Sequence, residues 1–69
     1  SVNVLLGGQA NDFIISIFSI QGDLIDQFKE QHLPSNRTFT IPLDYYPKGV
    51  YLINVICGDK IENIKLLKR

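Results

Sequence analysis

The sequence contains almost none of the residues that cross-link a small domain through disulfides or metal ions, or that carry out catalysis. Its 69 residues include one cysteine, Cys57, and one histidine, His32, with neither methionine nor tryptophan. A single cysteine excludes an internal disulfide, and no Cys/His set has metal-ligand spacing. The core must therefore come from aliphatic and aromatic side chains, in a domain that buries only about 60% of the surface of its unfolded chain.

A charge excess and a long apolar run are also missing. Seven Lys+Arg residues balance seven Asp+Glu residues, so no net field attracts nucleic acid or anionic lipid. The one local bias is a basic C-terminus with Lys65, Lys68 and Arg69. No apolar run approaches the roughly 18 residues of a membrane span. Ser1–Leu6 has no basic segment of a signal peptide, so we expect any export signal to lie upstream.

The titratable side chains do not form a catalytic or cofactor-binding set. His32 lies in a Gln-His-Leu-Pro segment and has no orienting partner in sequence, and Cys57 ends an apolar run, as a small buried hydrophobe does. The acids lack the dense spacing of a calcium loop and are interpreted as solubilising charges: Asp23, Asp26, Glu30, Asp44, Asp59 and Glu62. We predict neither catalysis nor a cofactor or metal site.

The pattern of apolar residues has a period of two, which predicts strands throughout. Phe13–Ile20 and Gly49–Cys57 are apolar on both faces and are predicted to form the middle of the fold. In Arg37–Leu43 the apolar side chains alternate with threonines, and Pro42 restricts this strand to an edge. We therefore predict an all-β fold, a small antiparallel β-sandwich of about six to seven strands, in one domain covering residues 1–69.

Three turn signals connect the predicted strands. Gln21-Gly22-Asp23 predicts a tight hairpin between Phe13–Ile20 and Leu24–Gln31. Gly58-Asp59 predicts a second hairpin, and Tyr46-Pro47-Lys48-Gly49 predicts a β-turn before Val50–Cys57. The sheet edges that result can pair with another chain, so the favoured function is protein recognition through the backbone.

These signals occur in an order that resembles a known family. Ile-Phe-Ser-Ile-Gln-Gly-Asp-Leu-Ile is followed by Pro47-Lys48-Gly49-Val50-Tyr51 and by a closing Ile64-Lys65-Leu66-Leu67-Lys68-Arg69. The chain resembles the type A C-terminal sorting domain of the type nine (Por) secretion system of Bacteroidetes. Tyr46 stands where the family usually has leucine, which we expect to alter only packing. The Pro-Asn-Pro opening of the family is absent, so we expect the N-terminal boundary to be truncated.

The resemblance implies an immunoglobulin-like β-sandwich at the C-terminus of a cargo protein. Such a domain directs the cargo from the periplasm through the outer-membrane translocon to the cell surface or the medium. It implies translocon and shuttle proteins as partners, and a surface sortase that removes the domain in many members. The family's motif positions correspond to seven residues of this sequence. They are Gly22 as the hairpin glycine, Pro47, Gly49 and Tyr51 as the turn-and-strand motif, and Lys65, Lys68 and Arg69 as the basic end.

Two alternatives stay open from the sequence. One is an immunoglobulin-like structural, adhesive or signalling module, retained on a surface protein or on a component of the secretion machinery. The other concerns assembly: Phe13–Ile20 is apolar enough on both faces to support a strand-exchanged homodimer. The sequence identifies neither the cargo nor whether the domain is cleaved.

Overall fold

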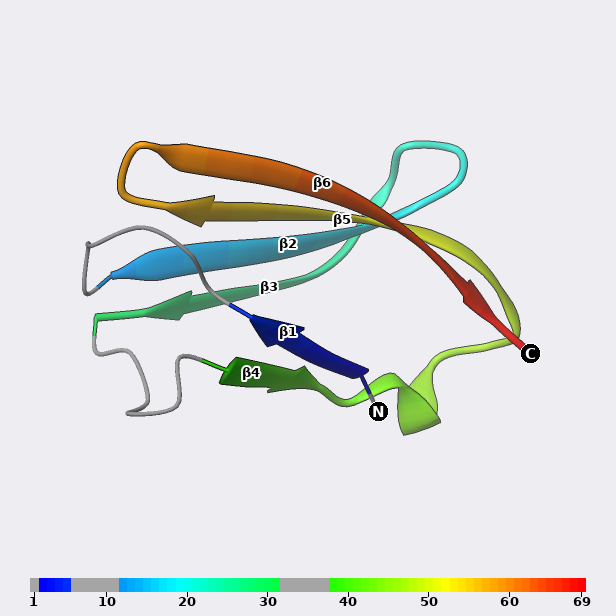
Figure 1. Cartoon of the computed structure of the whole chain (residues 1–69). Helices are drawn as coiled ribbons and strands as arrows, with labels where there is room; N and C mark the ends of the chain where they lie inside the picture. The colour runs from blue at the N-terminus through cyan, green and yellow to red at the C-terminus, as the bar shows by residue number, and fades with distance from the viewer. Residues whose placement is uncertain (1, 6–11, 32–37) are drawn as a thin grey trace.

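The computed structural model describes residues 2–5, 12–31 and 38–69 and shows two antiparallel sheets (Figure 1). Its strands are β1 (Val2–Leu5), β2 (Phe13–Ser19), β3 (Leu24–Glu30), β4 (Thr38–Ile41), β5 (Gly49–Cys57) and β6 (Lys60–Lys68). Strands β1 and β4 form a two-stranded sheet, and the larger sheet has the order β3-β2-β5-β6. The predicted small, immunoglobulin-like antiparallel sandwich is confirmed.

Strands β2 and β5 lie at the centre of the four-stranded sheet, as predicted from their apolar residues on both faces. Their register pairs Phe13 with Cys57 and Ile17 with Ile53. Among the described strands, the outer strands β3 and β6 are each paired on one side only. Strand β4, predicted as an edge from Pro42, belongs to the smaller sheet and ends at Ile41.

The core lies between the two sheets, because side chains on alternate positions of each strand face the opposite layer. Ile15 and Ile17 of β2, Ile53 of β5 and Ile41 of β4 are 0–1% exposed. Burying each of these side chains contributes roughly 1.5–3 kcal/mol. Cys57 is 2% exposed, which confirms its interpretation as a small buried residue.

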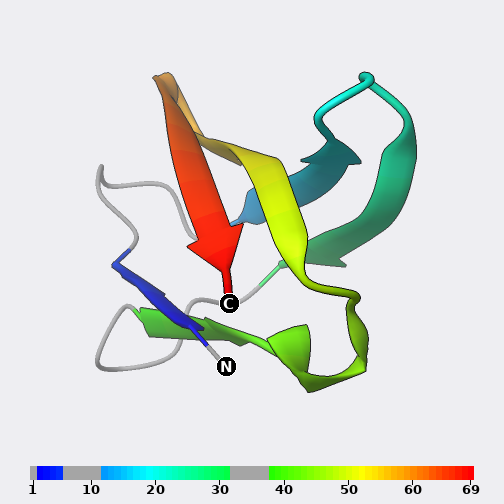
Figure 2. The ribbon, with the colours of Figure 1, turned by 90° about the vertical axis from the view of Figure 1, so that its right-hand side faces the viewer.

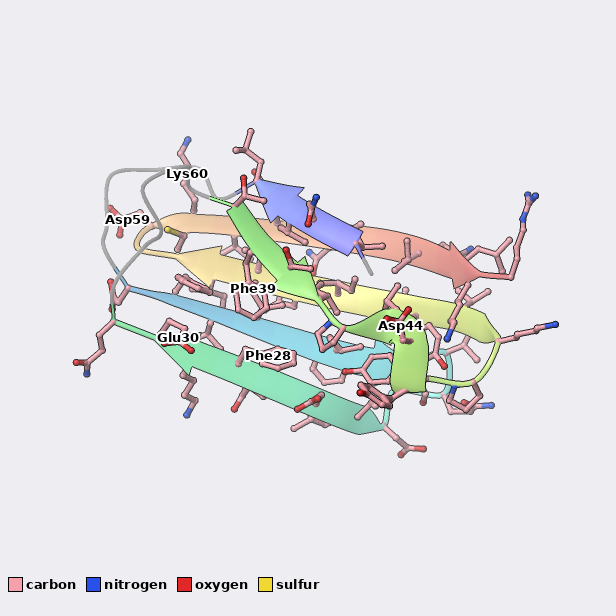
Figure 3. The ribbon with its side chains drawn as sticks, turned by 90° about the horizontal axis from the view of Figure 1, so that it is seen from below. Phe28, Glu30, Phe39, Asp44, Asp59 and Lys60 are labelled. Atoms are coloured by element: carbon pink, nitrogen blue, oxygen red, sulfur yellow. The ribbon has the colours of Figure 1, made fainter. Side chains whose placement is uncertain are left out.

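Phe39 of β4 joins the two sheets through aromatic contacts. Its ring lies 5.5 Å from that of Phe13 in an edge-to-face arrangement and 5.1 Å from that of Phe28. In the view from below, β1 and β4 lie over the four-stranded sheet, and Phe39 sits beside Phe28 (Figure 3). These contacts position the smaller sheet over one face of the larger one, called here the inner face.

The connections between strands follow the turn residues closely. Ile20–Asp23 closes the first hairpin: Gly22 N donates to Ser19 O over 3.0 Å and Ser19 N donates to Asp23 O over 2.9 Å. Gly58 and Asp59 form the second hairpin, with Cys57 opposite Lys60. Both predicted hairpins are confirmed.

One local element differs from the expectation for Arg37–Leu43. Leu43 does not continue strand β4 but begins a short 3-10 helix, η1 (Leu43–Tyr45), whose Leu43 O accepts a hydrogen bond from Tyr46 N. Pro42 ends the ladder because it has no amide hydrogen. Leu43 still reaches the core at 5% exposure, so its predicted apolar role holds although its backbone conformation does not. The predicted loop His32–Asn36 lies outside the described residues.

Candidate recognition surface

The motif residues gather at one end of the four-stranded sheet. This "motif end" consists of the hairpin turn Ile20–Asp23, the bend Pro47–Gly49, Tyr51 and Lys68. Register brings them together, since Tyr51 is opposite Ser19 and Gly49 is opposite Lys68. A hollow of about 450 Å³ lies between the turn and the bend. Figure 2 shows the chain's C-terminal end close to the bend that leads into β5.

Gly22 and Gly49 are required by their backbone conformations and not by lack of space. Gly22 has φ +95° and Gly49 has φ +154°, values that L side chains rarely adopt. A Cβ atom added at either position would meet no heavy atom within 4 Å. These two carried-over glycines therefore set the path of the chain at the motif end.

Tyr51 and Pro47 form one hydrogen-bonded unit. The Tyr51 side chain is 5% exposed, and its hydroxyl donates to Pro47 O. Its ring also packs 5.6 Å from that of Tyr46. The motif Pro-x-Gly-x-Tyr thus closes on itself: the tyrosine at the start of the strand holds the carbonyl of the proline that precedes it.

Tyr46 ties the bend to strand β3. Its hydroxyl donates to Asp26 Oδ2 over 3.0 Å. Partial burial, followed by this hydrogen bond and the Asp26 charge, raises the pKa of Tyr46 to about 12. The interpretation of Asp26 as a solubilising charge is therefore wrong, and Tyr46 makes a polar contact that the leucine usual in the family could not make.

The basic C-terminus is divided between three environments. Lys68 is half-buried on the inner side, where Nζ donates to Leu43 O over 2.5 Å and to Tyr46 O over 2.6 Å. Lys65 points to the opposite, outer face and is exposed, because odd and even positions of a strand face opposite ways. Arg69 is exposed directly after β6.

The Lys68 contacts secure the C-terminal strand to η1 and to Tyr46, directly before the bend. The lysine ammonium donates to the carbonyl of Leu43, where η1 begins, and to the carbonyl of Tyr46, the residue directly after η1. Hydrogen bonds to a charged group contribute about 1.5–3 kcal/mol. Lys68 is therefore a fastening residue, whereas Lys65 and Arg69 keep their charges at the surface.

No catalytic constellation accompanies these contacts. The described residues contain no group of three or more His, Cys, Asp or Glu side chains that could hold a metal ion. His32 lies outside the described residues, and the buried Cys57 lies at the end of the sheet far from Lys68. Asp59 and Lys60 lie at this far end beside β6, and Glu30 lies at the same end on β3, at the opposite edge of the sheet (Figure 3). Within the described ranges, no helix is long and apolar enough to cross a membrane.

The fold and the motif end define a small all-β domain whose turn residues lie together at one end of a sheet. The chain belongs to the family of secretion system C-terminal sorting domains, whose model matches residues 1–69, the whole chain. No curated protein and no solved structure matches it. The domain is thus a type nine secretion sorting signal, part of a cargo protein that is exported to the cell surface or secreted. Its family is not an enzyme family.

Proposed function

We propose that the folded domain directs its cargo from the periplasm through the outer-membrane translocon by protein–protein recognition. Translocon or shuttle proteins contact the last two strands, β5 and β6, at the motif end. In this proposal a surface sortase acts on the domain after passage. The recognition is of a folded surface, because the motif residues lie together only when the strands are paired.

The observation that carries this proposal is the fastening of Lys68 to Leu43 and Tyr46, in the segment that precedes the bend before β5. Its bonds to Leu43 O and Tyr46 O join the last strand to η1 and to the residue directly before Pro47. The register then places the exposed Lys65 opposite Leu52, and the exposed Arg69 directly after Lys68, which is opposite Gly49. A partner that contacts both joined segments distinguishes a folded cargo terminus from an unfolded one.

Strand β6 also offers a backbone surface to a partner. It is nine residues long and, of the strands that the structure describes, pairs with β5 alone, so half of its amide and carbonyl groups face away from the sheet. Such an edge can accept a strand from another protein. This supports β6 as part of the contact region and agrees with the position of the basic end.

The test is a reporter fusion in a Bacteroidetes host that has the type nine system. The chain is placed at the C-terminus of a fluorescent protein that bears a signal peptide, and surface, medium and periplasmic fractions are measured. We expect the intact fusion at the surface or in the medium. Periplasmic retention of a folded, protease-resistant intact fusion would contradict the proposal and favour a retained structural module.

Two variants separate recognition from folding. Removing Lys65–Arg69 also removes the Lys68 fastening, so it cannot distinguish a lost contact from a lost fold. The double substitution Lys65→Gln/Arg69→Gln keeps Lys68 and should reduce surface accumulation while the melting temperature stays unchanged. A short Gly-Ser tail after Arg69 should also reduce export if a partner reads the end of the chain, whereas a structural module would tolerate it.

A further inference from the structure

The outer face of the four-stranded sheet lies opposite β1 and β4, and no described element packs on it (Figures 1 and 2). Register and alternation place fifteen strand residues on this face: Ile14, Ser16, Phe18, Leu24, Ile25, Gln27, Lys29, Val50, Leu52, Asn54, Ile56, Ile61, Asn63, Lys65 and Leu67. Most of them are aliphatic or aromatic. A sheet face of this composition normally lies against another surface.

A row of polar side chains divides the outer face into two apolar halves. Gln27 Nε2 donates to Ser16 Oγ over 3.0 Å, and Asn54 Nδ2 donates to Asn63 Oδ1 over 2.9 Å. The four residues are opposite one another across all four strands. Because these side chains already have partners, a covering surface would leave few unpaired polar groups beneath it.

The half next to the motif end is the larger apolar surface. Its apolar residues, called here the motif-end patch, are Phe18, Leu24, Ile25, Val50, Leu52 and Leu67. Leu24 is 55% exposed, Ile25 42%, Leu52 38% and Leu67 56%. The register shift after Ile17 adds a residue to β3, so both Leu24 and Ile25 lie beside Phe18.

The patch is hollowed rather than flat. A depression of about 480 Å³ extends over Phe18 and Leu52, and Asn54, Asn63 and Lys65 line its other sides. A second hollow, lined by Ile25, Val50 and the bend Pro47–Gly49, lies nearer the motif end. A protruding apolar side chain of a partner fits such a depression, as anchor residues do in protein interfaces.

The charges on the outer face have one sign only. Lys29 and Lys65 are its only charged strand residues, and none of its fifteen strand residues is an acid. The acids of the same strands, Asp26, Glu30 and Glu62, occupy inner-facing positions. A partner that covers this face therefore gains by bringing carboxylates and gains nothing from further cations.

We propose that the motif-end patch is a docking surface for a protein with an exposed apolar residue flanked by Asp or Glu. The carboxylates would pair with Lys65, and the apolar residue would enter the depression over Phe18 and Leu52. The proposal rests on the proposed function, because it takes the occupant to be a component of the secretion machinery. It adds the surface that is contacted and the chemistry of the partner.

The charge pattern disfavours two other occupants. If a second copy packed its outer face against this one, lysines would face lysines, and no carboxylate among the strand residues of either face would pair with them. Binding of the domain to an anionic bilayer would gain only about 1 kcal/mol for each surface lysine, and the outer face carries two lysines. A concave patch also suits a protruding side chain better than a lipid surface.

The test uses the reporter fusion with substitutions that keep strand propensity. Leu52→Thr/Leu67→Thr removes apolar surface from the patch, and Lys65→Glu reverses its charge. Each should lower the ratio of surface to periplasmic reporter by roughly tenfold or more, as loss of a central anchor or charge pair does. Ile61→Thr is the matched control, since Ile61 is 65% exposed on the same face beyond the polar row, and should leave the ratio unchanged.

Photocrosslinking identifies the occupant. A benzoylphenylalanine at position 52 should form a crosslink to one protein of the secretion machinery in the living host, and the same residue at position 61 should not. The crosslink should be lost with Lys65→Glu, and the crosslinked peptide of the partner should contain Asp or Glu beside an apolar residue. A partner peptide without carboxylates would overturn the proposal.

The outcomes also separate this proposal from the proposed function. If the intact fusion stays in the periplasm, the proposed function fails first. If the intact fusion is exported and the patch variants are exported equally well, only the docking surface fails. Sedimentation showing a dimer that Leu52→Thr abolishes, or binding of the purified fusion to vesicles of equal phosphatidylglycerol and phosphatidylcholine that Leu52→Thr abolishes, would replace the protein partner with another occupant.

Discussion

The two faces of the four-stranded sheet carry similar aliphatic side chains in very different surroundings. On the inner face, Ile15, Ile17 and Ile53 are 0–1% exposed beneath β1 and β4. On the outer face, Leu52 and Leu67 are 38% and 56% exposed. The same period-two pattern produces both, so apolar content alone does not separate a residue that builds the fold from one that meets a partner.

The polar contacts differ in the same way. On the inner side, Lys68, Tyr46 and Tyr51 donate hydrogen bonds that hold the bend, the last strand and β3 together. On the outer face, the polar side chains pair with one another across the strands. The inner face therefore specifies the fold, and the outer face is the surface that we propose for recognition.

The largest expected difference lies between two neighbours on β5. Ile53→Ala should lower the free energy of unfolding by about 2–5 kcal/mol, because it opens a cavity at a residue that is 1% exposed. Leu52→Ala, on the opposite face, should cost less than about 1.5 kcal/mol. Urea denaturation of both variants measures the difference. Equal costs would mean that the outer face is covered within the domain.

A second comparison uses the two lysines of β6. Lys68→Met should destabilise the domain by about 2 kcal/mol, since it leaves the carbonyls of Leu43 and Tyr46 without their charged donor. Lys65→Met should change stability by less than about 0.5 kcal/mol. Thermal unfolding of both proteins gives the result, and a Lys68→Met variant as stable as the wild type would remove the fastening role.

Tyr46 provides a comparison that depends on pH. Its pKa is raised from 10.0 to about 12 in the folded protein, so its contribution to stability is complete below pH 10 and is lost as pH rises toward 12. Tyr46→Phe should cost about 1 kcal/mol at neutral pH and should flatten the fall in stability above pH 10. Tyr45→Phe is the control, because Tyr45 is 89% exposed. An identical alkaline profile for both variants would contradict the Tyr46–Asp26 interaction.

The smallest effect is expected in the polar row of the outer face. Asn63→Thr removes the acceptor of the exposed bond from Asn54 but keeps a residue that favours strands. The free energy of unfolding should change by less than about 0.5 kcal/mol. A loss above 1.5 kcal/mol, measured by urea denaturation, would mean that the polar row of the outer face stabilises the fold substantially.

Much of the fold could be predicted because local sequence patterns determine where strands and hairpins form. The apolar residues on both faces of Phe13–Ile20 placed β2 at the centre of the sheet, and Gly22 marked the first hairpin. The 3-10 helix at Leu43 could not be predicted in this way. Its carbonyls are stabilised by Lys68, which is 25 residues away in the chain.

The candidate surface was only partly visible in the sequence. The motif residues Pro47, Gly49 and Tyr51 could be named, but their meeting with Lys68 depends on the register between β5 and β6. Strand alternation alone would have placed Lys65 and Lys68 on opposite faces, and this signal was present in the sequence. The bond between Asp26 and Tyr46 had no such signal, because it joins segments 20 residues apart through tertiary packing.

The most direct test of the account measures export and stability on the same four fusions: the wild type, Lys65→Glu, Leu52→Thr/Leu67→Thr and Ile61→Thr. The account predicts that surface accumulation falls for Lys65→Glu and Leu52→Thr/Leu67→Thr while their free energies of unfolding stay close to that of Ile61→Thr, which is exported like the wild type. Export that follows the free energy of unfolding alone, whichever residue is changed, would contradict the assignment of the outer face to recognition.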